Sequence, residues 1–212
     1  SALLVFSFIS ISHFFSDWIH DMRKVIFALA ATAAMFAGAA QAETATYAVD
    51  PTHTFATFEI SHFGASVNRV RIDKKEGTVQ LDKAAKTGKV ELTLQMDSMN
   101  SGTLPFNKHL QSSEIFDAEK FPTAKFVGDK FTFDGDKVAS VSGLLTLKGK
   151  TQPVTFKANQ FACYDSPMVK REVCGGDFEA TIDRTAFGVD YGVAYGFPKN
   201  VRIVAQIEAI KQ

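Results

Sequence analysis

Hydrophobic and polar residues alternate with a period of two along most of the chain from residue 54 onward. The clearest case is the segment 89–96, in which Val90, Leu92 and Leu94 alternate with charged and polar residues. This period places the apolar side chains on one face of a β-strand and is typical of antiparallel strands with one buried face. The same pattern predicts strands at 54–62, 77–82, 89–96, 125–133, 141–147, 153–158, 178–183 and 201–208.

Short turn signals separate several of these segments. They are Thr87-Gly88, Asp134-Gly135-Asp136 and Lys148-Gly149-Lys150, and turns of this length join neighbouring strands into hairpins. About eight strands joined in this way predict an up-and-down antiparallel sheet. Because closure into a barrel removes the exposed edges of such a sheet, we predict an all-β protein with an eight-stranded antiparallel up-and-down barrel.

One segment departs from the alternation. Residues 104–118 place Phe106, Leu110 and Phe116 at loosely helical spacing, and Pro122 disfavours helix in the residue before it. We therefore predict a short helical insertion between two strands. Its side chains are too apolar for a solvated loop, so we expect them to cover part of the barrel or its mouth.

The first 42 residues have the features of a targeting segment rather than of a folded domain. Met22-Arg23-Lys24 is basic, residues 25–38 are apolar, and Ala40-Gln41-Ala42 supplies the small residues of a signal-peptidase site. This order predicts a cleaved signal peptide at 22–42 and export to the periplasm. A membrane anchor is disfavoured because the apolar run is shorter than the roughly 20 residues of a membrane span. We interpret residues 1–21 as a leader from a start site placed too far upstream.

Composition narrows the function of the remaining chain, residues 43–212, which is one domain by size. Over the full sequence 23 Lys and Arg balance 23 Asp and Glu, so no nucleic-acid partner is indicated. The two cysteines are Cys163 and Cys174. In an exported protein this pair predicts a disulfide. A catalytic or redox pair would favour the Cys-x-x-Cys spacing, which the sequence lacks.

Three histidines fall in the mature chain: His53, His62 and His109. His53 and His62 are nine positions apart, which places them on opposite faces of a regular strand. A metal site needs its ligands together, so none is predicted. His62 shares a strand face with Phe58 and Ile60. It is either a core histidine bonded to a backbone carbonyl, which we favour, or a head-group contact at a cavity mouth.

Asp183-Arg184 follows an apolar strand and has two interpretations. Arginine offers paired donors that could hold a phosphate or carbonyl group. The alternative, which we favour, is a structural ion pair or backbone anchor at the barrel rim. The sequence contains no nucleophile elbow, Gly-rich phosphate loop or HExxH motif, so no catalytic residue and no cofactor are predicted.

Six ordered stretches make the segment from Thr46 to Gln212 similar to one known family. They are 47–54 (YAVDPTHT), 60–63 (ISHF), 109–117 (HLQSSEIFD), 120–126 (KFPTAKF), 143–154 (GLLTLKGKTQPV) and 182–188 (IDRTAFG). Together they resemble the YceI-like family of periplasmic, lipocalin-like, polyisoprenoid-binding proteins. The resemblance implies an extended eight-stranded barrel whose apolar interior holds a long isoprenoid chain, with an isoprenoid quinone or a polyprenyl phosphate as ligand.

The residues themselves support a narrower expectation. An eight-stranded barrel is just wide enough to be filled by side chains or to hold one small ligand, and 14 of the 20 Phe lie in the mature chain. With the resemblance, we expect a carrier or storage protein for an isoprenoid lipid, without a cofactor besides that lipid. The alternative is an enzyme acting on such a lipid, with His62 or Arg184 at the head group. The sequence leaves open whether two chains form a homodimer.

We predict that the inward strand faces, the insertion and two polar residues at the mouth contact the lipid. Near turns the pairing register can slip by one residue and reverse the face, which affects Phe131, Phe133 and Phe156 most. The predicted contacts are Phe58, Ile60, His62, Val90, Leu92, Leu94, Phe106, Leu110, Phe116, Phe126, Phe131, Phe133, Leu145, Phe156, Phe178, Ile182 and Arg184.

Overall fold

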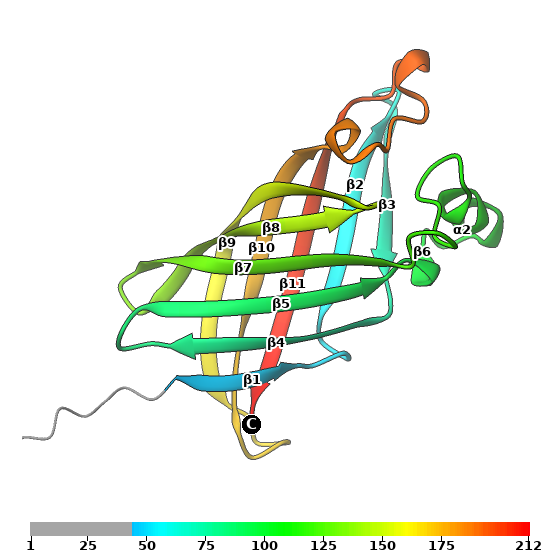
Figure 1. Cartoon of the computed structure of the whole chain (residues 1–212). Coiled ribbons are helices and arrows are strands. Elements are labelled where there is room, and N and C mark those ends of the chain that lie inside the picture. The colour runs from blue at the N-terminus through cyan, green and yellow to red at the C-terminus, as the bar shows by residue number, and fades with distance from the viewer. Residues whose placement is uncertain (1–43) are drawn as a thin grey trace, which may run out of the picture. The chain divides into compact units, whose positions relative to one another are not determined.

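A single antiparallel sheet runs through residues 44–212, which are the residues that this computed structural model describes (Figure 1). The predicted leader and signal peptide lie outside the described residues. The strands are β1 (Ala45–Val49), β2 (Phe55–His62), β3 (Ser66–Ile72), β4 (Lys75–Asp82), β5 (Thr87–Gln95), β6 (Met99–Asn100), β7 (Thr123–Asp134), β8 (Lys137–Leu147), β9 (Lys150–Asp165), β10 (Glu172–Asp183) and β11 (Asn200–Lys211). The helices are α2 (Leu104–Gln111) and the 3-10 turns η1 (Met96–Ser98), η2 (Arg184–Phe187) and η3 (Val193–Tyr195).

The sheet closes into a ring of eight strands in the order β1, β4, β5, β7, β8, β9, β10 and β11. Closure occurs because β11 pairs with β10 on one edge and with β1 and β2 on the other. Along the chain, β1 leads into β2 and β3 leads into β4, so each of these two pairs counts as one long strand. The two long strands lie side by side, because β1 pairs with β4 and β2 pairs with β3. Counted in this way, the eight long strands follow one another up and down the barrel. The predicted all-β, eight-stranded architecture is confirmed.

Three strand segments were not predicted from the sequence: β1, β3 and the two-residue β6. β3 buries only Val70 and Ile72, while Ser66, Arg69 and Arg71 are exposed. Two buried apolar residues in seven give too weak an alternation to be recognised. β3 is nevertheless held by its backbone pairing with β2 over its whole length.

The predicted helical insertion is present, but its helix is shorter than the range 104–118 and spans only Leu104–Gln111. Residues beyond the helix form turns, in which the N–H of Phe116 donates to the carbonyl of Leu110 at 3.1 Å. Ile115 and Phe116 are buried there. The spacing suggested more helix because these two side chains point toward the core from a turn rather than from a helical face.

A close approach between two strands bends the barrel wall. Gly128 in β7 lies opposite Gly143 in β8, and a Cβ on Gly143 would sit 2.1 Å from the carbonyl oxygen of Val127. Only glycine fits this contact, and the register shifts immediately after it, between Gly128 and Lys130. The extra residue reverses the alternation of inward and outward side chains. Phe126 and Phe131, which are five positions apart, therefore both face inward.

One lysine joins the two segments that cover the same end of the barrel. Lys148, in the β8–β9 turn, donates from Nζ to the carbonyl of Ile115 at 2.6 Å and to the carbonyl of Gly188 at 3.1 Å. Ile115 belongs to the insertion and Gly188 to the loop that follows η2. We call this end, where the β2–β3 turn also lies, the mouth of the barrel (Figure 1).

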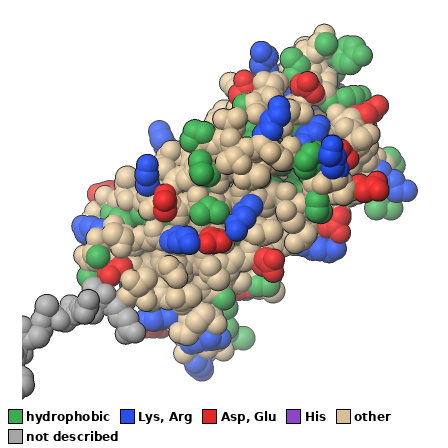
Figure 2. All heavy atoms as spheres, viewed as in Figure 1, with side chains coloured by type: hydrophobic (Ala, Val, Ile, Leu, Met, Phe, Trp, Pro, Cys, Tyr) green, Lys and Arg blue, Asp and Glu red, His purple; other side chains and the backbone are tan. Residues whose placement is uncertain are grey.

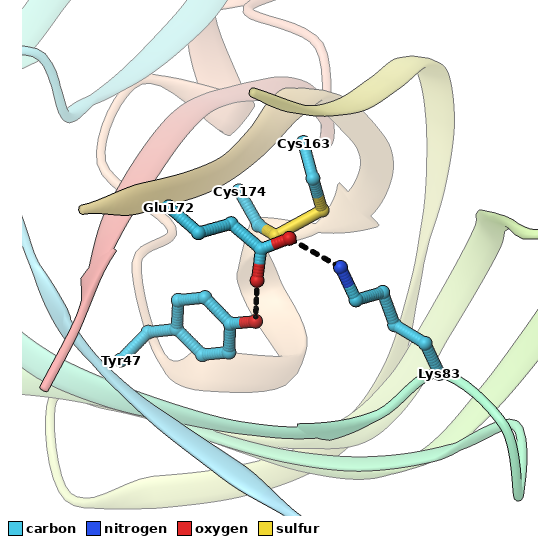
Figure 3. The surroundings of a disulfide bond; sticks show 5 residues. All are labelled: Tyr47, Lys83, Cys163, Glu172 and Cys174. Carbon is cyan, nitrogen blue, oxygen red and sulfur yellow. Dashed lines mark hydrogen bonds and ion pairs between the residues drawn. A yellow bond between two sulfur atoms is a disulfide. The ribbon is translucent and has the colours of Figure 1, made fainter. Parts of the chain in front are cut away.

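A polar strut crosses the opposite end, which we call the base (Figure 3). The buried Tyr47 of β1 donates from its hydroxyl to Glu172 at 2.6 Å, and Glu172 also pairs with Lys83 of the β4–β5 turn. Lys83 lowers the pKa of Glu172, and burial together with the hydrogen bond to Glu172 raises the pKa of Tyr47. β10 and β4 are separated by β11 and β1 in the ring, so the strut joins parts of the wall that are not paired.

The predicted disulfide between Cys163 and Cys174 is formed beside this strut. The two cysteines lie within strands and not in a long turn. β9 and β10 extend past them, so that the two residues are direct cross-strand partners and only 166–171 forms the turn.

Replacing both cysteines by alanine should lower the free energy of unfolding by roughly 3 kcal/mol, because the closed loop no longer restricts the unfolded chain. Urea unfolding of the Cys163→Ala/Cys174→Ala variant against the oxidised protein measures this loss. Mass analysis of native protein should show a gain of a pair of hydrogen atoms on reduction. Free thiols in native protein would contradict the bond.

A second prediction concerns Asp50, in the turn segment between β1 and β2. Burial of Asp50 opposes its ionisation, but hydrogen bonds from Thr52 and His53 outweigh burial and lower its pKa from 3.8 to about 2. A lowered pKa gives stability that is present above pH 3.8 and is lost as the pH falls toward about 2. We expect Asp50→Asn to destabilise the protein above pH 3.8, with the difference vanishing near pH 2 in urea titrations. A difference that stays constant across this range would contradict the assignment.

Candidate ligand-binding cavity

A cavity of about 750 Å³ runs inside the barrel. This volume lies within the range of roughly 300–1,000 Å³ that is typical of small-molecule sites. Its walls are the inward, mostly apolar side chains of nearly every strand. Of the two alternatives for an eight-stranded barrel, filled or hollow, the structure therefore shows the hollow one.

The structure brings nearly all the predicted contact residues together on this wall. Phe133 is the exception. It lies near the end of β7, beside a second register shift whose extra residue is in β8, with its ring centroid 6.5 Å from that of Phe131, and it does not line the cavity. Those that line the cavity are Phe58, Ile60, His62, Val90, Leu92, Leu94, Phe106, Leu110, Phe116, Phe126, Phe131, Leu145, Phe156, Phe178, Ile182 and Arg184. Their contact with a ligand stays a prediction.

Sequence reasoning missed the inward faces of two predicted strands, β4 and β11. The alternation along each strand already separated the inward residues from the outward ones, so the signal was available. The missed lining residues are Val79 and Leu81 of β4 and Val201, Ile203, Ala205, Ile207 and Ala209 of β11. Tyr191, Tyr195 and Phe197 also line the cavity from the loop between η2 and β11. No periodic pattern marks a loop, so the sequence carried no comparable signal for them.

Aromatic contacts organise the inside of the cavity. The rings of Phe126 and Phe156 meet edge to face, with centroids 5.0 Å apart. The ring of Phe116, from the insertion, lies 5.6 Å from that of Phe58 on β2. Such pairs stabilise beyond their buried area, so the insertion is fixed to the barrel wall as a cover.

The mouth is formed where three loops meet. The ring of His62 lies 5.0 Å from Phe63 and 5.3 Å from Phe197, and His109 of α2 lies 4.9 Å from Tyr191. His62 is exposed. The favoured interpretation of His62 as a buried core histidine is therefore wrong, because β2 ends at this residue and its side chain reaches the open end of the cavity.

Arg184 anchors the loop that forms one side of the mouth. It is 6% exposed, and it donates from Nε to the carbonyl of Pro198 at 2.9 Å and from Nη1 to the carbonyls of Val189 and Tyr191, both at 2.8 Å. The role of backbone anchor is confirmed. Its Nη2 is buried without a hydrogen-bond partner among the described residues. Burial lowers the pKa of Arg184, while the charges of Asp190 and Asp183 partly offset that effect.

One group of potential metal ligands occurs within residues 44–212: Cys163, Glu172 and Cys174. The two sulfur atoms are bonded to each other in the disulfide, so they are not available as thiolate ligands. The cavity lining is mostly apolar and includes polar side chains such as His62 and Arg184 at the mouth, so the chemistry that it offers is mainly burial of an apolar chain.

Comparison with known proteins agrees with this architecture. Residues 47–209 match the profile of the YceI-like domain. The chain belongs to the YceI-like family. A curated relative, a UPF0312 protein of Pseudomonas aeruginosa strain LESB58, is 33% identical over 196 residues, covering 90% of this chain and all of that protein.

Solved structures share the fold. BcnA of Burkholderia cenocepacia superposes with a TM-score of 0.62 at 23% identity, covering 76% of this chain and 99% of that one. A polyisoprenoid-binding domain of Saccharophagus degradans superposes with a TM-score of 0.56 at 14% identity, covering 80% and 100%. At these sequence identities, the structural similarity establishes that the chains share the barrel fold. Within residues 44–212 no helix has the length and apolar character needed to span a membrane.

The loop that forms one side of the mouth should depend on Arg184 for its stability. Arg184→Met would leave the carbonyls of Pro198, Val189 and Tyr191 without their donor, and we expect a loss of about 3 kcal/mol in urea unfolding. The exposed Lys199, in the same loop, provides a matched control as Lys199→Met. Equal stability of the two variants would show that Arg184 does not hold the loop.

Proposed function

We propose that this protein is a periplasmic binding protein that carries or stores a long-chain isoprenoid lipid inside its barrel. The observation that carries the proposal is the apolar cavity of about 750 Å³ enclosed by the strands. Membership of the YceI-like family and the fold shared with a domain described as polyisoprenoid-binding support it. The disulfide suits an oxidising compartment such as the periplasm.

The lipid tail is bound by burial of apolar area. Each Å² removed from water contributes roughly 25 cal/mol, and an isoprenoid chain offers such area along its length with functional groups only at one end. The cavity matches this distribution because its side walls are aliphatic and aromatic. Affinity should therefore depend more on tail length than on the head group.

The head group lies at the mouth in this proposal. Two classes of ligand fit, an isoprenoid quinone and a polyprenyl phosphate, because both present acceptor oxygens at one end of a long chain. The polar groups at the mouth include the ring of His62 and the guanidinium of Arg184, whose Nη2 has no partner within the described chain. Arginine donors bind carbonyl and phosphate oxygens alike.

The arrangement supports binding rather than catalysis. A catalytic histidine is oriented by a polar partner and hydrogen-bonds the group it activates. The recorded ring neighbours of His62 are instead the aromatic side chains of Phe63 and Phe197. The proposed protein therefore holds its lipid without transforming it and uses no cofactor besides that lipid.

Filling the cavity tests the proposal. Leu92 lines the cavity from β5, and Thr93 is its neighbour on the outer face of the same strand. We expect Leu92→Trp to fold but to lose most co-purified lipid, because the indole occupies the volume of the tail. Thr93→Trp adds the same bulk outside and should keep the lipid.

Native mass spectrometry and lipid extraction of both variants, checked by circular dichroism, provide the measurement. Folded Leu92→Trp protein that carries as much of the same lipid as Thr93→Trp would show that the tail does not lie along β5. Protein from the native host with no bound lipid, which also takes up no polyprenol when loaded from detergent, would contradict the function itself.

A further inference from the structure

Phe63 occupies an unfavourable position in two respects. It lies at the tip of the β2–β3 turn with φ of 53°, followed by Gly64 at 76°, so a bulky residue adopts the left-handed conformation. The N–H of Ala65 donates to the carbonyl of His62 at 3.1 Å, so Phe63 and Gly64 are the two central residues of this turn. A turn with positive φ at both central residues strongly prefers Asn-Gly or Asp-Gly there, and bulky residues are outliers. Its ring is also 60% exposed to water. Strain of this sort persists where a function depends on it.

Phe63 belongs to a group of four aromatic residues that we call the aromatic rim: Phe63, Tyr191, Tyr195 and Phe197. Tyr195 is 75% exposed and Tyr191 42% exposed, and the ring of Phe197 lies 4.6 Å from that of Phe63. All four also line the cavity. The rim is therefore one continuous apolar surface that leads from the inside of the barrel to its exterior. Figure 2 shows exposed hydrophobic side chains at this end of the molecule.

We infer that the aromatic rim docks on the surface of a lipid bilayer and that the bound lipid passes between bilayer and cavity through it. This inference rests on the proposed function, since a long isoprenoid chain is costly to expose to water. A rim continuous with the cavity gives the chain an apolar path. Tyrosine rings, with one apolar side and one polar tip, are enriched where proteins meet the bilayer interface.

The exposed area favours a bilayer over a second copy of the chain. An aromatic side chain offers roughly 150–250 Å², so the exposed parts of Phe63, Tyr191 and Tyr195 supply roughly 350 Å². A stable protein interface needs about 800 Å² from each partner. The rim falls well short of that, whereas reversible adsorption to a bilayer is achieved with a small apolar area.

The test replaces Phe63 by asparagine. Because Asn suits the left-handed conformation, Phe63→Asn should keep the fold with an unchanged or higher Tm. Met168→Asn is the matched control, since Met168 is 87% exposed in the β9–β10 turn at the base. The first readout is flotation with plain vesicles of phosphatidylethanolamine and phosphatidylglycerol. The second is the rate of uptake of a fluorescent polyprenol from the same vesicles.

We expect Phe63→Asn to lower both vesicle binding and uptake rate about tenfold, on the order of the benefit of burying one Phe side chain, with Met168→Asn unchanged. Equal flotation of Phe63→Asn and wild-type protein, or no flotation of either, would overturn the inference. So would a wild-type dimer that is lost in Phe63→Asn by sedimentation. Loading of polyprenol from detergent bypasses the membrane. Failure at that step contradicts the proposed function, while flotation still decides the docking.

Discussion

The barrel depends on the pairing of β11 along both of its edges. An ordinary domain is held by a densely packed interior, but here a cavity of about 750 Å³ occupies the axis. Side chains on facing walls have less to pack against, so the hydrogen-bond ladders around the wall carry more of the fold. β11 pairs with β10 over nearly its whole length and with both β1 and β2 on its other edge. Without it, the sheet would have two open edges and the cavity would be exposed to water.

The wall of the barrel was predictable because alternation is imposed at every step of a strand with one buried face. The cores of all eight long strands follow from it, as does the inward position of Val90, Leu92 and Leu94. Phe133 shows the limit of the pattern. It keeps the alternation of β7 with Phe131, but it lies next to the β7–β8 turn and does not line the cavity. Alternation predicts the face on which a residue lies, but not how far along the strand the cavity extends.

The mouth was less predictable than the wall for a related reason. Its residues come from three loops that have no periodic pattern, and they meet only because β2, α2 and the loop after η2 end at the same side of the barrel. Residue type misled for His62, since a histidine between apolar positions suggests burial. Residue type served better for Arg184, because a buried guanidinium needs several acceptors and a nearby loop can supply backbone carbonyls.

The strut at the base makes the two ends of the cavity different. Tyr47, Glu172 and Lys83 tie non-adjacent parts of the wall together at one end, next to a covalent bond between β9 and β10, while the other end is bordered by loops. Under the proposed function, a lipid therefore enters this tube by its tail and departs by its polar end. Exchange in that case occurs in a fixed orientation, so a receiving membrane or protein meets the polar end first.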